Sequence, residues 1–360
     1  MKMPRVQRDL NIELLRIILM MMIIYHHFIV HGLGLSQIIE ADFSLTNHTI
    51  KDAFIDCFLI MPVNCFVFIS GYYGLKFRTK TVVNLLVQTT TYSLLFYLLY
   101  DLFFAEVSMH TLTIGLFPIS YGIWWYISTY FFLYLLSPLL NVVNRSLTKF
   151  QFLFILGILT LSTYFIGYFF DSTFLGLGEG KAVMSFITIY FWGQAFNSYF
   201  AGFTRGKYFY LATYLASSGL IFLFCYYFMT HESFGYAWKV LYFNNPLVLI
   251  AAISFFFFFK NMKLGSHNIF GLSASVLGVY LIHDHRSVRL LLIERVNNMM
   301  ETYNINVVYL LLIGATVLVF LVASMIEKVR AKVMDPAVNY LFKRYNLDRY
   351  DERINFVGVK

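Results

Sequence analysis

The residues best suited to chemistry lie in one apolar segment, 11–35, which carries Glu13, Arg16 and His27. An arginine keeps its charge and offers a fork of N–H donors that suits a phosphate group. A histidine, whose ordinary pKa is about 6.5, can accept a proton from a hydroxyl group near neutral pH. The segment therefore offers an anion-binding group and a proton-accepting group on one stretch of chain.

Helical spacing puts these groups on one side of the segment. At ~100° per residue, Arg16 and His27 return to within about 20° of each other. Glu13 and His31 lie about 60° away on the same side, whereas His26 points roughly 80° the other way. At a rise of ~1.5 Å per residue, Arg16 and His27 are roughly 16 Å apart along the axis. The pattern predicts a helix with a polar face along its length.

Composition places this helix in a membrane protein. Of the 360 residues, 59% are hydrophobic and only 13% are charged, which excludes a soluble globular protein. The formal net charge of +8 comes from short basic clusters between apolar segments, a pattern that indicates membrane topology and not nucleic-acid binding. The three cysteines lie in apolar segments without metal-binding spacing, so we expect no disulfide and no metal site.

The chain contains ten apolar segments of about the length that crosses a bilayer, namely 12–35, 53–75, 82–104, 123–143, 150–170, 182–201, 208–229, 241–259, 269–293 and 305–327. Basic residues gather at the N-terminus, in every second loop and in the tail. By the positive-inside rule, both termini are cytoplasmic. We therefore predict an all-α polytopic membrane helical bundle of about ten transmembrane helices (1–328) and a basic, interfacial cytoplasmic tail (329–360).

This topology sets the depth of the polar residues. The first and ninth helices both run outward, so His283 lies at nearly the same depth as His27. The second and fourth helices enter from the outside, which brings Asp56 and Trp125 to the same outer half. Farther in, the second helix carries Ser70 toward the level of the arginine in the first helix. Ionisable groups at such depths are functional candidates, because burying them without a partner is costly.

Structural roles stay open for several of these residues. A membrane histidine such as His26 can be a packed helix contact as easily as a base. Glu13 and Arg16, three positions apart, can form an ion pair at a helix end. Trp125 can belong to the aromatic belt at the membrane surface, and Ser70 can serve a close helix contact.

Four sequence motifs appear in a fixed order. The first helix carries an arginine, ten intervening residues and a histidine, with an acidic residue three positions before the arginine. An aromatic-rich run, Phe66–Tyr72, ends in Ser-Gly-Tyr, and a Trp-Tyr pair is followed by the run Leu133–Leu140. The stretch Tyr280–His283 reads Tyr-Leu-Ile-His. Together these motifs resemble the acyltransferase-3 integral membrane acyltransferases, which include O-acetyltransferases of bacterial cell-surface polysaccharides.

The resemblance implies an O-acyltransferase of the bacterial cytoplasmic membrane. Its donor would be cytoplasmic acyl-CoA, most simply acetyl-CoA, used as a co-substrate and not as a permanently bound cofactor. Its acceptor would be a hydroxyl group of a cell-surface or lipid-linked saccharide. On this basis we assign catalysis to His27 as general base with Arg16, Glu13 and His283, donor binding to Arg16, Ser70, Lys76 and Arg78, and acceptor binding to Asp56, Trp125 and Tyr280.

A different class of function is a proton-coupled transporter or flippase of a saccharide or small anionic solute. In such proteins intramembrane His, Arg and Glu side chains form a proton or substrate pathway. They often show inverted repeats and broken helices, whereas this chain has six prolines and no visible repeat. The expected partners are acyl-CoA, a saccharide and the lipid bilayer, with no nucleic acid, and the sequence predicts no particular oligomeric state.

Overall fold

The computed structural model describes residues 9–36, 47–104, 108–170, 176–202, 205–264 and 270–355, and in these ranges it contains helices and no strands. The prediction of an all-α membrane bundle is therefore confirmed. Seven helices are long and apolar enough to cross a membrane, and two further apolar helices are shorter. The chain is thus a multi-pass membrane protein. The basic residues among the first eight positions lie outside the described residues.

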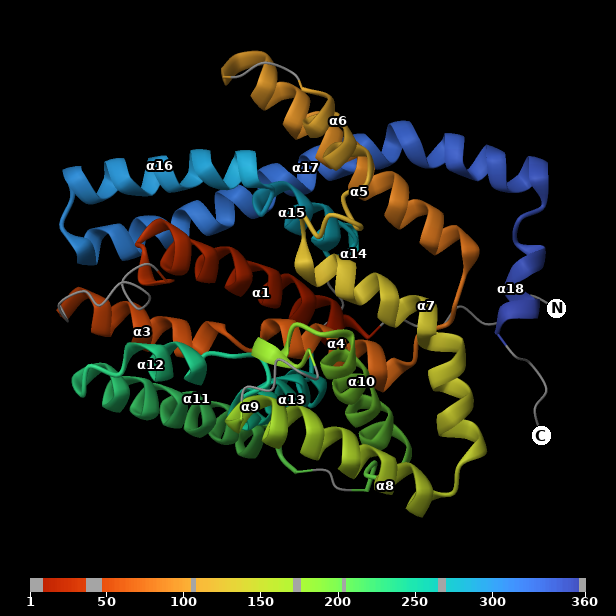
Figure 1. Ribbon diagram of the computed structural model, residues 1–360, viewed down its shortest axis with the longest axis horizontal. Helices are drawn as coiled ribbons and strands as arrows, with labels where there is room; N and C mark the ends of the chain where they lie inside the picture. The colour runs from red at the N-terminus through yellow and green to blue at the C-terminus, as the bar shows by residue number, and fades with distance from the viewer. Residues whose placement is uncertain are drawn as a thin grey trace.

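Figure 1 shows the order of the helices along the chain. The first half contains α1 (Leu10–His27), its π-helical end η1 (Phe28–Gly32), α3 (Asn47–Leu59), α4 (Pro62–Tyr73), α5 (Thr79–Phe104), α6 (Met109–Leu116), α7 (Trp125–Ser146), α8 (Lys149–Thr160), the π-helical η2 (Leu161–Ile166) and α9 (Gly167–Phe169). The second half contains η4 (Gly178–Gly180), α10 (Val183–Ser198), α11 (Lys207–Thr230), α12 (Phe234–Val240), α13 (Pro246–Lys260), α14 (Phe270–Ser273), α15 (Val276–His283), α16 (Arg286–Thr302), α17 (Ile305–Tyr345) and α18 (Arg349–Ile354).

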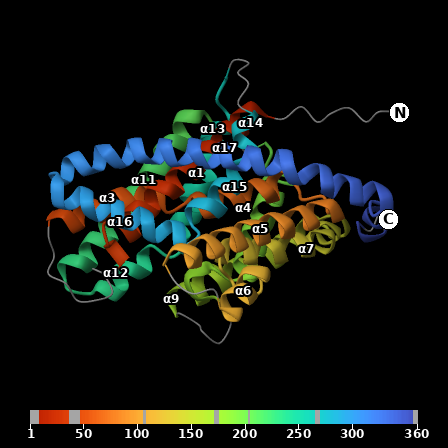
Figure 2. The same ribbon diagram turned by 90° about the horizontal axis from the view of Figure 1, so that it is seen from above.

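Several of the expected spans differ from the helices observed. The span 53–75 is divided between α3 and α4, and Pro62 begins the second helix, where its missing N–H group costs nothing. The span 269–293 is divided among α14, α15 and α16. The span 305–327 is only the first part of α17, which continues to Tyr345 across the expected boundary at 328. Figure 2 shows α17 running along most of the length of the molecule.

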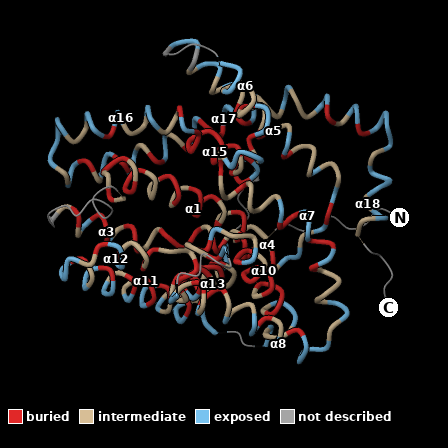
Figure 3. The backbone as a smooth tube through the Cα atoms, viewed as in Figure 1, coloured by how far each residue is buried: buried red, intermediate tan, exposed pale blue. Residues whose placement is uncertain are grey.

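The helix α1 lies at the centre of the bundle (Figure 1). It packs against α3, α4, α13, α14, α15 and α17. In Figure 3 its buried positions join those of α4, α10, α13 and α15, while the outer helices α8, α11, α16 and α17 carry most of the exposed ones. The apolar outer surface can face lipid. The polar face of α1 would be costly there, so it lines the interior instead.

A close helix contact fixes α4 beside α10. A Cβ atom added to Gly193 of α10 would lie 2.5 Å from the backbone nitrogen of Tyr72, and one added to Gly71 of α4 would meet the backbone of Tyr190. Small residues let membrane helices approach in this way. The contact holds Ser70, the neighbour of Gly71, at a fixed place in the interior.

Buried charge holds α17 against α5 and α15. Glu327 of α17 accepts a hydrogen bond of 2.6 Å from the Tyr92 hydroxyl of α5, and Arg330 donates to both its carboxylate oxygens at 2.7 and 2.9 Å. On α15, a Cβ atom at Gly278 would overlap the Glu327 side chain. Removing one partner would leave a buried charge uncompensated, so this cluster fixes the long helix in register.

A second set of contacts gathers one end of the bundle. Lys260, at the end of α13, lies 2.9 Å from the carboxylate of Asp9, which caps α1. The Asn11 side chain of α1 donates to the backbone oxygen of Met262, which follows α13. The beginning of α1 and the end of α13 therefore meet on the same side of the molecule, as the alternating loop charges predict.

Candidate functional site

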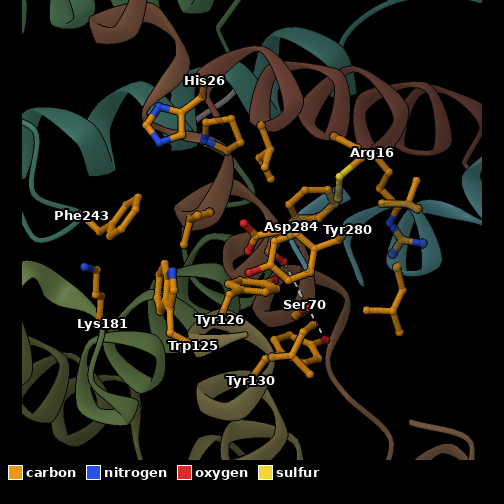
Figure 4. A pocket seen from close by; sticks show the side chains of 18 of the residues that line it. Arg16, His26, Ser70, Trp125, Tyr126, Tyr130, Lys181, Phe243, Tyr280 and Asp284 are labelled. Atoms are coloured by element: carbon orange, nitrogen blue, oxygen red, sulfur yellow. Dashed lines mark hydrogen bonds between the residues drawn. The ribbon is translucent and has the colours of Figure 1, made fainter. Parts of the chain in front are cut away.

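A continuous cavity of about 1170 Å³, lined by described residues, runs through the bundle beside α1. Nine of the ten predicted site residues line it, namely Glu13, Arg16, His27, Asp56, Ser70, Lys76, Arg78, Trp125 and Tyr280. His283 is the exception and lies behind the wall. Figure 4 shows Arg16 at one side of the pocket and His26, Trp125 and Lys181 at the other. We refer to these as the Arg16 end and the His27 end of the cavity.

The Arg16 end carries three basic side chains and one acidic one. Arg16, Lys76 and Arg78 line this end together with Glu13. Glu13 is only 4% exposed and lies 3.4 Å from the Arg16 guanidinium, whose side chain is 39% exposed. The carboxylate therefore holds one nitrogen of the guanidinium in place, while the fork still faces the cavity. Excess positive charge at the mouth of a pocket attracts anions such as phosphate groups.

The loop between α4 and α5 presents Lys76 and Arg78, and α7 fixes its backbone. The Tyr134 hydroxyl donates to the Lys76 carbonyl at 3.1 Å and accepts from the Arg78 N–H at 2.9 Å. The Asn141 side chain donates to the Leu75 carbonyl at 2.7 Å. These contacts satisfy the backbone of the loop and hold its two basic residues at the cavity.

The C-terminal helix α18 packs against the same loop. The Asp351 carboxylate accepts hydrogen bonds of 2.7 Å from both the backbone N–H and the hydroxyl of Thr79, the first residue of α5. The Asn355 side chain donates to the Phe77 carbonyl at 2.9 Å. An acidic side chain at a helix N-terminus is favourable both as a cap and toward the helix dipole. The tail therefore contributes to the shape of the Arg16 end.

Hydroxyl groups line the middle of the cavity. The Ser70 hydroxyl donates to the Phe66 carbonyl at 3.1 Å, which leaves its oxygen to accept from Tyr130 at 2.9 Å (Figure 4). Tyr126 stacks on Tyr130, with ring centroids 5.8 Å apart, and meets Tyr280 edge-on at 5.9 Å. Ser70 is thus joined to α7 and faces the space between the two ends.

His27 lies beside a carboxylate at the other end of the cavity. Its Nδ1 atom is 3.5 Å from Oδ1 of Asp284, which also accepts a hydrogen bond of 3.2 Å from Arg289. The distance to Asp284 is that of an ion pair and is longer than an ordinary hydrogen bond. A carboxylate on the Nδ1 side favours a proton on that nitrogen, which leaves Nε2 able to act as a base.

His283 lies next to His27, as its predicted depth requires. The two imidazole rings are 5.2 Å apart between centroids. Nδ1 of His283 donates to the Val279 carbonyl at 2.7 Å, which leaves Nε2 without a proton, and this Nε2 is buried with no hydrogen-bond partner among the described residues. Since His283 does not line the cavity, it contacts the candidate base but has no direct access to a ligand there.

Asp56 is paired with the neighbouring histidine. Its carboxylate lies 2.5 Å from Nδ1 of His26, and both residues line the His27 end. Asp52, one turn earlier on α3, forms a similar pair with His48 at 2.6 Å and accepts from the Tyr309 hydroxyl at 2.7 Å. The predicted ligand-binding residue Asp56 therefore already has a partner, and His26 joins α1 to α3.

Aromatic rings form the wall at the His27 end. Trp125 lies 5.2 Å from Phe243 between ring centroids, and the Lys181 ammonium group lies 5.7 Å from the Trp125 ring. Trp238 lines the same end of the cavity, with Glu179 nearby. Flat apolar faces with a few charged groups at their edge suit a ligand that is polar at its rim and apolar on its faces.

Sequence reasoning missed three of the residues that line this cavity. Asp284 directly follows the His283 motif, and an acidic side chain at the end of an apolar run is itself a signal. Arg289 lies one turn into α16, and its role depends on a helix break that no periodicity predicts. Gln88 lies on α5 with Asn84 one turn before it, a polar spacing that is visible in an apolar segment.

A protein-family model described as an acyltransferase domain matches residues 9–325 of this chain. The match runs from the first residues of α1 to well inside α17, so it includes every residue that lines the cavity. No curated protein and no solved structure matches the chain. The match gives no support to the transporter alternative.

Proposed function

The chain belongs to the acyltransferase-3 family, and from that premise we propose that it transfers an acetyl group from acetyl-CoA to a saccharide hydroxyl. The observation that carries the proposal is the continuous cavity that joins a cationic end to a histidine end. A donor with phosphate groups and an acceptor with hydroxyl groups need such different surroundings. The two substrates can then meet inside the protein.

The donor would enter at the Arg16 end. CoA carries phosphate groups, and the cluster of Arg16, Lys76 and Arg78 supplies the charge to bind them. Its thioester lies at the tip of a thin arm, and Arg16 and His27 are roughly 16 Å apart along α1. An arm of this kind can carry the thioester to the base while the phosphates stay behind. The bacterial cytoplasm, which contains acyl-CoA, would therefore lie at the Arg16 end.

The acceptor would enter at the His27 end. Trp125 and Tyr280 supply ring faces, and His26, which is held by Asp56, offers a polar group to sugar hydroxyl groups. A cell-surface or lipid-linked saccharide of the bacterial cytoplasmic membrane is a substrate with these properties. One hydroxyl group must reach hydrogen-bond distance of Nε2 of His27.

The reaction needs one group that accepts a proton and later returns it, and it neither consumes nor releases a proton overall. Nε2 of His27 takes the proton of the acceptor hydroxyl while its oxygen attacks the thioester carbonyl carbon. A C–O bond forms, the C–S bond breaks, and the leaving thiolate takes the proton back from the imidazolium. Asp284 stabilises the positive charge that His27 carries between the two transfers. His283 supports the ring of His27 without touching the substrates.

The test is a transfer assay with radiolabelled acetyl-CoA in membranes that hold the native acceptor. The variant His27→Ala should lose transfer by about 100-fold or more, the usual contribution of a general base. The variant Arg16→Ala should raise the KM for acetyl-CoA. His231→Ala, which removes an exposed histidine beyond α11, is the matched control. Full transfer by His27→Ala, or an unchanged KM in Arg16→Ala, would contradict the proposal.

A further inference from the structure

A stripe of polar side chains on α5 lines the cavity between its two ends. Thr81, Asn84 and Gln88 all face it, with Leu85 between them. Their spacing of three and four residues places them on one side of a helix. The helix otherwise reads as an apolar membrane segment. Asn84 and Gln88 therefore form a polar surface inside the protein, while Thr81 is exposed.

Gln88 is buried and has no hydrogen-bond partner within the part of the chain that the structure describes. Only 8% of the residue is exposed. A carboxamide has both N–H donors and an acceptor oxygen, and native proteins rarely leave such groups without a partner. Because Gln88 lines the cavity, its N–H and C=O groups are open to whatever occupies that space.

The polar stripe on α5 lies between the two ends of the cavity. Gln88 is ten residues beyond Arg78, which is roughly 15 Å along α5. Arg16 and His27 are separated by a similar length along α1, and α1 and α5 both line the cavity. A ligand that reaches from the basic cluster toward His27 must therefore pass Asn84 and then Gln88.

We propose that Asn84 and Gln88 form a subsite for the amide groups in the pantetheine arm of the acyl-CoA donor. The inference rests on the proposed function, because it assumes that donor. A carboxamide side chain has both donors and acceptors, and it can bond to the N–H and the C=O of an amide. A phosphate would prefer the cationic cluster, and a hydrocarbon chain would leave both side chains unsatisfied. The amides of the arm match the stripe in chemistry and in place.

Binding to purified protein in lipid nanodiscs separates the parts of the donor. The probes are CoA, adenosine 3′,5′-bisphosphate, which has phosphates and no arm, and pantetheine, which has the arm amides and no phosphates. Gln88→Leu should weaken the binding of CoA and of pantetheine by about 5-fold to 10-fold, the effect of losing one neutral hydrogen bond. It should leave the bisphosphate unchanged. Asn84→Leu, a second variant, should show the same pattern.

Thr90→Val is the matched control, because its hydroxyl lies on α5 but bonds the Leu116 carbonyl outside the cavity. Equal CoA binding by wild type, Gln88→Leu and Asn84→Leu would overturn the subsite. A loss of bisphosphate binding as large as the loss of CoA binding would also overturn it, since the effect would then not belong to the arm. Absence of CoA binding by wild-type protein would instead contradict the proposed donor, so the two failures are distinguishable.

Discussion

At the scale of residues, the surroundings of His27 distinguish it from the other histidines near it. His26 is paired with Asp56, and His283 donates to a backbone carbonyl behind the cavity wall. His27 and His26 both line the cavity beside a carboxylate, but the Asp284 carboxylate lies 3.5 Å from Nδ1 of His27, a looser contact than the 2.5 Å pair of His26 with Asp56. That carboxylate, Asp284, is shared with Arg289. The proposed base, His27, and the group proposed to orient it, Asp284, thus come from two different segments of the chain.

The variant Asp284→Asn tests this arrangement. The amide keeps the shape but removes the charge that orients His27 and stabilises its imidazolium form. We expect kcat to fall by about 10-fold to 100-fold, a part of what a general base contributes, while the KM for acetyl-CoA stays near the wild-type value. The control Arg289→Gln removes the ion pair of residue 289 with Asp284 but keeps the carboxylate beside His27, so kcat should fall less. A wild-type kcat in Asp284→Asn, or an equal loss in both variants, would exclude an orienting role.

The sequence predicts which of these residues share a face of one helix better than it predicts which residues meet between helices. Arg16 and His27 could be placed on one face because ~3.6 residues make a turn whatever the helix packs against. The contact of Asp284 with His27 depends instead on where α15 ends and which helix it meets. The same holds for the pairing of Asp56 with His26, which the sequence shows only as two ionisable residues at a similar depth.

At the scale of elements, breaks in helices create the His27 end. Asp284 caps the end of α15, and His285 caps the start of α16, where its side chain accepts from the Ser287 N–H at 3.3 Å. Without this break, α15 and α16 would form one continuous helix. A second break, before Pro62, separates α3 with its two aspartate pairs from α4 with Ser70. Proline marks the second break in the sequence, whereas no glycine or proline marks the first.

The tail element α18 should control donor binding through the loop that it caps. Asp351→Ala removes the cap on α5, worth about 1 kcal/mol, and loosens the loop that carries Lys76 and Arg78. We expect the KM for acetyl-CoA to rise by about 3-fold to 10-fold with kcat retained. Glu352→Ala removes the same charge from an exposed neighbour and serves as control. A tail without this role would give equal KM values in both variants.

The helices themselves were largely predictable, because long apolar segments leave few alternatives in a membrane. The end of α17 was not predictable, because the residues beyond 328 mix charged and apolar side chains and do not resemble a transmembrane segment. The packing of α18 on the loop after α4 joins residues more than 270 positions apart. Such a contact depends on the whole bundle, and no local pattern contains it.

At the scale of the whole molecule, the cavity has ends of different chemistry. Among the described residues, the Arg16 end is lined by Arg16, Lys76 and Arg78 together with one carboxylate, that of Glu13. At the His27 end, carboxylates offset the basic residues among aromatic rings and histidines. An anionic donor is therefore favoured at one end and a neutral, hydroxyl-bearing acceptor at the other. In the proposed function, the bundle would bring these two substrates together across the bilayer.

Sealed inside-out membrane vesicles test this central claim most directly, because they expose the cytoplasmic face to added acetyl-CoA, which does not cross the bilayer. With radiolabelled acetyl-CoA outside, wild-type protein should place label on saccharide enclosed within the vesicles, and His27→Ala should place none although it still binds CoA. Label found only on material at the outer, donor-exposed surface, or enclosed label at the wild-type rate with His27→Ala, would contradict the account.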